Sequence, residues 1–235
     1  MPITTMLRLA RWGTLSFVAL ASVAIALYPG GTLRNPSTHG YRPLQQFGSD
    51  LGMSRAWNGQ SNRLGAGVFV MGELALAAAI GALVTGMVSI AASGVSRLLA
   101  RVAGAAGIVA GSGFVVTAFT APDRFPVLHV RSAALAFRAA CVAALLLTGA
   151  ILLDPRFTRR TVLSAAGTAF LLLAFVGVTT WGPRLETDLG LVLLVAAQKI
   201  VVLAALSTMW HVSRKAERVS NRAERASASP VRSEQ

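Results

Sequence analysis

The chain has only one cysteine, Cys141, among its 235 residues. A single thiol cannot form a disulfide within the chain, and it excludes metal sites built from several cysteines. Acidic residues are also scarce, since nine Asp and Glu stand against 22 Lys and Arg. Charged residues of both signs make up 13% of the chain, whereas soluble domains contain about 25%. This composition excludes an ordinary soluble globular protein.

The net charge of +13 does not indicate nucleic-acid binding. Arginine and lysine lie at the ends of apolar blocks and in the tail, without interleaved aromatic residues, whereas a nucleic-acid surface needs cations clustered on one solvated face. Membrane topology and contact with anionic lipid explain their placement better. We therefore expect membrane lipids as partners, with no nucleic acid and no cofactor.

Long apolar runs dominate the chain, which is 54% hydrophobic with a mean hydropathy of +0.61. A helix needs about 20 predominantly apolar residues to cross a membrane. Six blocks approach or exceed that length, at residues 12–28, 66–92, 102–121, 132–153, 161–181 and 189–210. Their apolar residues are continuous and do not alternate, which excludes a β-barrel. The predicted fold class is all-α, a polytopic membrane bundle of six transmembrane helices.

The first block also resembles a secretory signal peptide, because a short basic segment precedes it and Ala24-Ile25-Ala26 offers a small-residue cleavage site. Pro29-Gly30-Gly31 is, however, an ordinary end for a helix. Keeping the block gives an even number of helices, so we expect it to remain as the first span. Cleavage is the alternative.

Cations are distributed unequally between the two sides of the six predicted helices, with thirteen on the side of the N-terminus and seven on the other. The positive-inside rule therefore places both termini in the cytoplasm of a multi-pass plasma-membrane protein, which in a bacterium means the inner membrane. The predicted parts are a cytoplasmic N-terminus (1–11), a transmembrane domain (12–211) with an outer loop (29–63), and a basic, disordered cytoplasmic tail (212–235).

The outer loop is too long to be a simple connection, because loops above about 12 to 15 residues are usually functional or disordered. Its large apolar residues argue against disorder; they are Tyr41, Leu44, Phe47, Leu51, Met53 and Trp57. We expect the loop to pack onto the bundle. Residues 54–62 are expected to form a short interfacial helix with Trp57 at the level of the lipid headgroups.

Three ionisable residues, Glu73, Arg138 and Lys199, lie within predicted spans. Charge inside a membrane is costly, so such residues are candidates for function. Glu73 and Arg138 are both about two turns from the outer ends of their helices, and this equal depth allows them to pair. Lys199 lies deeper, beside Gln198. A structural ion pair or snorkelling of Arg138 is the alternative to transport, and the sequence has neither the repeat nor the broken helices common in transporters.

The outer side also collects His39, Asp50, Asp123 and His129, with Ser49 nearby. Histidine and carboxylate can bind zinc or supply a general base, but no HxxxH or HExxH spacing is present. The alternative is that Ser49 or Asp50 caps a short helix and that His129 is an interfacial hydrogen-bonding residue.

Three glycines lie on one face of the third predicted helix, at Gly104, Gly107 and Gly111. Small residues at this spacing let helix backbones approach closely. The face is therefore expected to pack tightly, either within the bundle or between subunits of a homo-oligomer.

Several short motifs together resemble the domain of unknown function nine-nine-eight, a family of six-helix prokaryotic membrane proteins. They are Phe47-Gly48-Ser49-Asp50-Leu51-Gly52, then Asn62 and Gly65, then Asp123, Pro126 and His129, and finally Gln198-Lys199-Ile200 and Trp210. The chain is also distantly similar to the eukaryotic DRAM and Frag group. The resemblance implies a six-helix fold and an outer polar cluster, but it carries no activity over.

We expect the outer polar site to recognise a lipid headgroup or another amphiphile without catalysis. The ligand-binding candidates are Ser49, Asp50, Asp123, His129, Glu73, Arg138 and Lys199. One alternative is a metal-dependent intramembrane hydrolase, with His39, His129 and Asp50 as weak metal-ligand candidates. The other is a small transporter that uses Glu73, Arg138 and Lys199.

Overall fold

The computed structural model describes residues 1–92, 94–182 and 185–228. Over these ranges the chain forms six long α-helices and one short 3-10 helix, and it contains no strands, only two isolated β-bridges. The elements in order are α1 (Ile3–Leu27), η1 (Gly48–Gly52), α2 (Arg63–Ile90), α3 (Val95–Phe119), α4 (Pro126–Leu152), α5 (Arg159–Trp181) and α6 (Asp188–Ala228). All six α-helices are long and apolar enough to cross a membrane, which confirms the predicted helical bundle.

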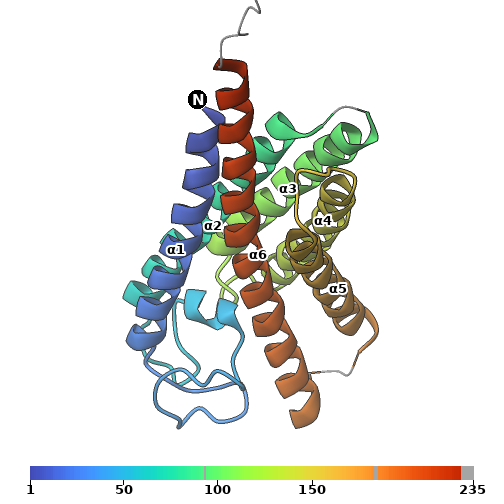
Figure 1. Cartoon of the computed structure of the whole chain (residues 1–235). Helices are drawn as coiled ribbons and strands as arrows, with labels where there is room; N and C mark the ends of the chain where they lie inside the picture. The colour runs from blue at the N-terminus through green and yellow to red at the C-terminus, as the bar shows by residue number, and fades with distance from the viewer. Residues whose placement is uncertain (93, 183–184, 229–235) are drawn as a thin grey trace, which may run out of the picture.

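The six helices form a closed ring in chain order. Each helix packs against the next one along the chain, and α6 returns to pack against α1. The N-terminus and the last described turn of α6 consequently lie at one end of the bundle, which we call the terminal end (Figure 1). The long connection between α1 and α2, residues 28–62, covers the opposite end. We call it the first loop, and that end the loop end.

The helices extend beyond the predicted blocks at the terminal end. α1 begins at Ile3, so most of the segment expected as a separate N-terminus is helical. α6 continues through Ala228, so residues 212–228 of the tail that was expected to be disordered are helical. The physical reason is packing, because Leu7 and Ala10 of α1 and Val212 and Ala216 of α6 share one buried apolar cluster. Two cations of the topology argument, Arg184 and Arg232, lie outside the described residues.

The glycine face of α3 packs against α2 of the same chain. A Cβ atom on Gly107 would lie 2.6 Å from Val84 of α2, and one on Gly104 would lie 3.0 Å from Val88. Gly111 faces the backbone of Ala77, also on α2. The three glycines therefore allow the close approach of α2 and α3, and homo-oligomerisation stays a prediction.

The first loop is folded and packed on the bundle, as expected from its apolar residues. Leu51 and Tyr28 belong to a buried cluster with Phe17 of α1 and Phe69 of α2. The short helix is not at residues 54–62, where the backbone instead forms turns and an antiparallel bridge between Arg55 and Ser61. It lies earlier, at Gly48–Gly52. Turn formation at Gly59, whose φ is +80°, is incompatible with a helix there.

Candidate functional site

The first loop is built around Gln46, whose side chain is completely buried. Its Nε2 donates to the carbonyl oxygen of Gly31 at 2.9 Å, and its Oε1 accepts from the backbone N–H of Arg42. The amide thus ties together two stretches of loop backbone that are far apart in sequence. The sequence marked the polar run at residues 45–52 that contains Gln46, but it gave this side chain no role, because a polar residue in a loop has no pattern that reveals such backbone partners.

Two neighbouring residues of α6 anchor the loop. Lys199 Nζ donates to the carbonyl oxygen of Gln46 and lies 5.5 Å from the centre of the Tyr41 ring. Gln198 Oε1 accepts from the backbone N–H of Gly48 at 2.9 Å. Gln198 lies ten residues into α6, about 15 Å along the axis at about 1.5 Å per residue. The loop therefore reaches down beside α6, and the helix satisfies its polar backbone groups.

Asp50 is part of the loop core. Its Oδ2 accepts from the backbone N–H of Phe47 at 3.1 Å and from Trp57 Nε1 at 3.3 Å. The bond from the Phe47 N–H caps the start of η1. This is the capping role that the sequence offered as an alternative for Asp50. Burial raises the pKa of Asp50 to about 6, against the opposing influence of Trp57, Phe47 and the positive charge of Lys199. Its visible role is therefore to shape the loop.

Asp123 fastens the first loop to the connection between α3 and α4. Its Oδ1 accepts from the Ser54 backbone N–H at 3.0 Å, and its Oδ2 accepts from the Ser54 hydroxyl at 2.5 Å and the Arg55 N–H at 3.1 Å. Partial burial alone would raise the pKa of Asp123, but these hydrogen bonds together lower it below its ordinary value. Asp123 therefore favours the ionised form.

His129 is buried near the start of α4. Its Nδ1 lies 2.7 Å from the carbonyl oxygen of Thr120, which can only accept, so Nδ1 carries the proton and Nε2 of the neutral ring is an acceptor. The Ser132 hydroxyl donates to the His129 carbonyl at 3.0 Å. His129 thus has the hydrogen-bonding role that one alternative assigned to it.

Glu73 and Arg138 do not form the ion pair that their equal depth allowed. Oε2 of Glu73 is buried without a hydrogen-bond partner, and Arg138 is exposed and makes no hydrogen bond or ion pair to any residue that the structure describes. The reason is the ring arrangement, in which α4 packs on α3 and α5 while α2 lies on the far side of α3. The three ionisable residues expected for transport consequently lie in three different environments.

The weak metal-ligand candidates of the hydrolase alternative, His39, His129 and Asp50, are also dispersed. His39 is exposed at the surface of the first loop, where its backbone pairs with Gly30. No group of three or more His, Cys, Asp or Glu side chains gathers anywhere in the described ranges. The arrangement gives no support to a metal-dependent hydrolase.

The structure does bring several predicted residues together, in a groove of about 700 Å³ at the loop end. The groove runs between α4, α5 and α6 beneath the first loop, and we call it the loop-end groove. Its polar edge includes Ser49, His129, Arg138, Glu186 and Gln198. Its apolar walls include Phe47, Phe137, Phe175, Val176, Trp181 and Leu194. Three of the seven predicted binding residues thus line one site.

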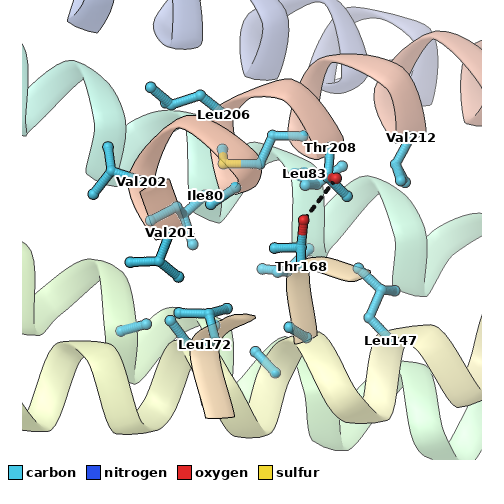
Figure 2. A pocket seen from close by; sticks show the side chains of 18 of the residues that line it. Ile80, Leu83, Leu147, Thr168, Leu172, Val201, Val202, Leu206, Thr208 and Val212 are labelled. Atoms are coloured by element: carbon cyan, nitrogen blue, oxygen red, sulfur yellow. Dashed lines mark hydrogen bonds between the residues drawn. The ribbon is translucent and has the colours of Figure 1, made fainter. Parts of the chain in front are cut away.

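Behind the groove lies an apolar cavity of about 140 Å³ in the centre of the helix ring (Figure 2). Leu83, Leu172 and Val201 are among its lining residues, and the two threonine hydroxyls at its edge, Thr168 and Thr208, bond to each other at 2.9 Å. Phe137 borders both the cavity and the loop-end groove. Because its lining is almost entirely apolar, this cavity suits hydrocarbon better than water.

The site combines the unpaired guanidinium of Arg138, the carboxylate of Glu186, amide and hydroxyl groups, and a long apolar wall. Such a combination matches a molecule with an anionic head and a hydrocarbon tail. Gln198, Phe137 and Trp181 were not predicted as site residues, although Gln198 stood out as an amide within an apolar block. No known protein-family model matches the chain, and neither does any curated protein or solved structure. The resemblance noted from the short motifs therefore stays a prediction.

Proposed function

We propose that this chain is a multi-pass plasma-membrane protein, with both termini in the cytoplasm, that binds an anionic amphiphile in the loop-end groove without catalysis. The orientation rests on the excess of cations on the terminal side. It places the groove at the outer leaflet, where lipids diffuse past its open side. A bacterial inner membrane is the setting that we propose.

The observation that carries the binding proposal is the position of Arg138. Its side chain is exposed, has no carboxylate partner among the described residues, and lies at the polar edge of a groove whose walls are mainly apolar. Arginine binds phosphate oxygens through two parallel N–H groups. A lipid phosphate at Arg138 would place its acyl chain against Phe137, Phe175 and Leu194. Ser49, Gln198 and Nε2 of His129 supply further polar contacts at the edge.

The other predicted residues then act indirectly. Lys199, Asp50 and Asp123 hold the first loop over the groove through the hydrogen bonds described above. They are positioning residues in this proposal, and the first loop forms the cover of the site.

Native mass spectrometry of the detergent-purified protein tests the proposal. Wild type is expected to retain a phospholipid, and Arg138→Ala to retain it roughly tenfold less, because a hydrogen bond to a charged group contributes about 1.5 kcal/mol. Arg131→Ala is the matched control, since Arg131 is an exposed arginine on the same helix that does not line the groove. Equal lipid loss in both variants, or no loss in either, would contradict the proposal.

A further inference from the structure

A second hollow lies at the terminal end, between the first turns of α1 and the extension of α6. It has a volume of about 700 Å³, and four arginines line it, namely Arg8, Arg11, Arg214 and Arg218. Figure 1 shows the two helices side by side at this end. From the sequence, these cations were explained by membrane topology and contact with anionic lipid. The sequence did not predict a pocket, because the four arginines come together only when α1 and α6 pack. We call this hollow the arginine pocket.

One carboxylate organises the pocket. Glu217 Oε1 accepts from Arg8 Nε at 2.6 Å, and Glu217 Oε2 pairs with an Arg11 nitrogen at 2.6 Å. The Glu217 side chain is 14% exposed and that of Arg11 is 17% exposed, whereas Arg8 is 61% exposed. Glu217 therefore fixes Arg11 on the floor of the pocket and leaves most of the Arg8 side chain open to solvent.

Arg214 and Arg218 are exposed and have no ion pair or hydrogen bond to the described part of the chain. They are four residues apart, so they lie on one face of α6. With one carboxylate against four guanidinium groups, the pocket holds an uncompensated excess of three positive charges. The charge of the pocket therefore favours an anionic ligand.

Two tryptophans give the depth of the pocket in the membrane. Trp12 and Trp210 line it on the side toward the centre of the bundle, and the Arg11 guanidinium lies 6.0 Å from the centre of the Trp210 ring. Trp12 is 65% exposed, and exposed tryptophan is typical of the membrane–water interface. Arg214 and Arg218 follow Trp210 by about 6 and 12 Å along the helix. In a membrane with these tryptophans at its interface, the two arginines would lie at the level of the lipid phosphates.

We propose that the arginine pocket binds a membrane lipid whose headgroup carries two phosphate charges. A single phosphodiester would leave most of the excess charge uncompensated, whereas two phosphates can each accept paired N–H groups from arginine. Inorganic phosphate or diphosphate shares this chemistry, but the tryptophan edge of the pocket adjoins lipid. The inference does not depend on the loop-end groove, which lies at the opposite end of the bundle.

Lipid titrations followed by native mass spectrometry test this inference on the full chain. The probes are cardiolipin, which has two phosphates, and phosphatidylglycerol, which has one. Wild type is expected to bind one cardiolipin roughly tenfold more tightly than phosphatidylglycerol. Arg214→Ala/Arg218→Ala should remove this preference. Arg159→Ala/Arg160→Ala is the matched control, because it removes two exposed arginines at the same end, outside the pocket, and it should keep the preference.

Three results would overturn the inference. They are equal affinity for the two lipids in wild type, equal loss in both double variants, and displacement of cardiolipin by an equimolar amount of inorganic diphosphate, which would identify a soluble anion as the ligand. Thermal unfolding checks that the variants fold. Should the alanine variant not fold, Arg214→Lys/Arg218→Lys replaces it. It keeps the charge but loses the paired geometry, and it should weaken cardiolipin binding several-fold without changing phosphatidylglycerol binding.

Discussion

Individual polar side chains hold the first loop mainly by bonding to backbone groups. Gln46 is the completely buried example, and Asn62 donates from Nδ2 to the carbonyl oxygens of Leu51 and Met53 at 3.0 and 2.9 Å. A loop that reaches down beside a membrane helix has to satisfy its backbone groups within the protein, because hydrocarbon offers no hydrogen bonds. This requirement explains why so many polar residues of the loop are buried.

Asp50 should make the stability of the protein depend on pH. Burial raises its pKa from 3.8 to about 6, so the folded state binds the proton more tightly than the unfolded chain does. The free energy of unfolding therefore falls as the pH rises from about 4 to about 6, by up to about 3 kcal/mol. Asp50→Asn keeps an acceptor for Phe47 and Trp57 and should remove this dependence. Thermal unfolding of both proteins between pH 4 and 8 measures it.

Asp123→Asn is the control for that experiment. The pKa of Asp123 is lowered by its hydrogen bonds, which outweigh the opposing effect of burial. Its stabilising contribution is thus present above the pKa of the unfolded chain and is lost only at lower pH. Asp123→Asn should leave the slope between pH 4 and 6 unchanged. A slope that persists in Asp50→Asn would contradict the proposed role of Asp50 burial.

Among whole elements, α3 shows most clearly how glycine determines packing. Gly104, Gly107 and Gly111 face α2, as a small-residue face predicted, while Gly113 permits a second close approach, to α4. A Cβ on Gly113 would lie 2.9 Å from the Cβ of Ala136 and 3.1 Å from its Cα. The spacing rule did not select Gly113, because it points to a different neighbour from the other three glycines.

Gly113→Val should destabilise the bundle by about 1 to 3 kcal/mol, since the added atoms meet the backbone of α4, which cannot move aside as a flexible side chain can. Gly167→Ala is the contrasting variant on α5, because nothing lies within 4 Å of a Cβ at Gly167. It should leave stability unchanged or raise it by up to about 1 kcal/mol through better helix propensity. Thermal unfolding in one detergent compares the two. Similar effects of both substitutions would contradict the packing argument.

For the whole molecule, the closed ring of six helices puts the N-terminus and the last described turn of α6 at one end and the first loop at the other (Figure 1). The proposed orientation can be tested with single cysteines in a Cys141→Ala background. Gln60 in the first loop and Ala223 on α6 are both exposed. A membrane-impermeant maleimide should label Gln60→Cys in intact cells and Ala223→Cys only after lysis. The reverse pattern would place the loop-end groove in the cytoplasm.

Sequence alone determined the class of this protein and the number of its helices. The length and hydropathy of each apolar block decide whether it can span a membrane as a helix. Both can be read from the residues of that block alone. The start of α1 and the end of α6 could not be predicted from the sequence, because packing between residues about 200 positions apart keeps those segments helical.

Only the tertiary structure decided which residues meet. It separated Glu73 from Arg138, joined Lys199 to the loop, and brought four arginines together around Glu217. Depth along a helix can be counted from sequence, but the face that each helix presents to its neighbours cannot, because transmembrane helices are apolar on most sides and lack a clear periodic signal. Both proposed binding sites lie between packed helices, so each forms only when those helices come together.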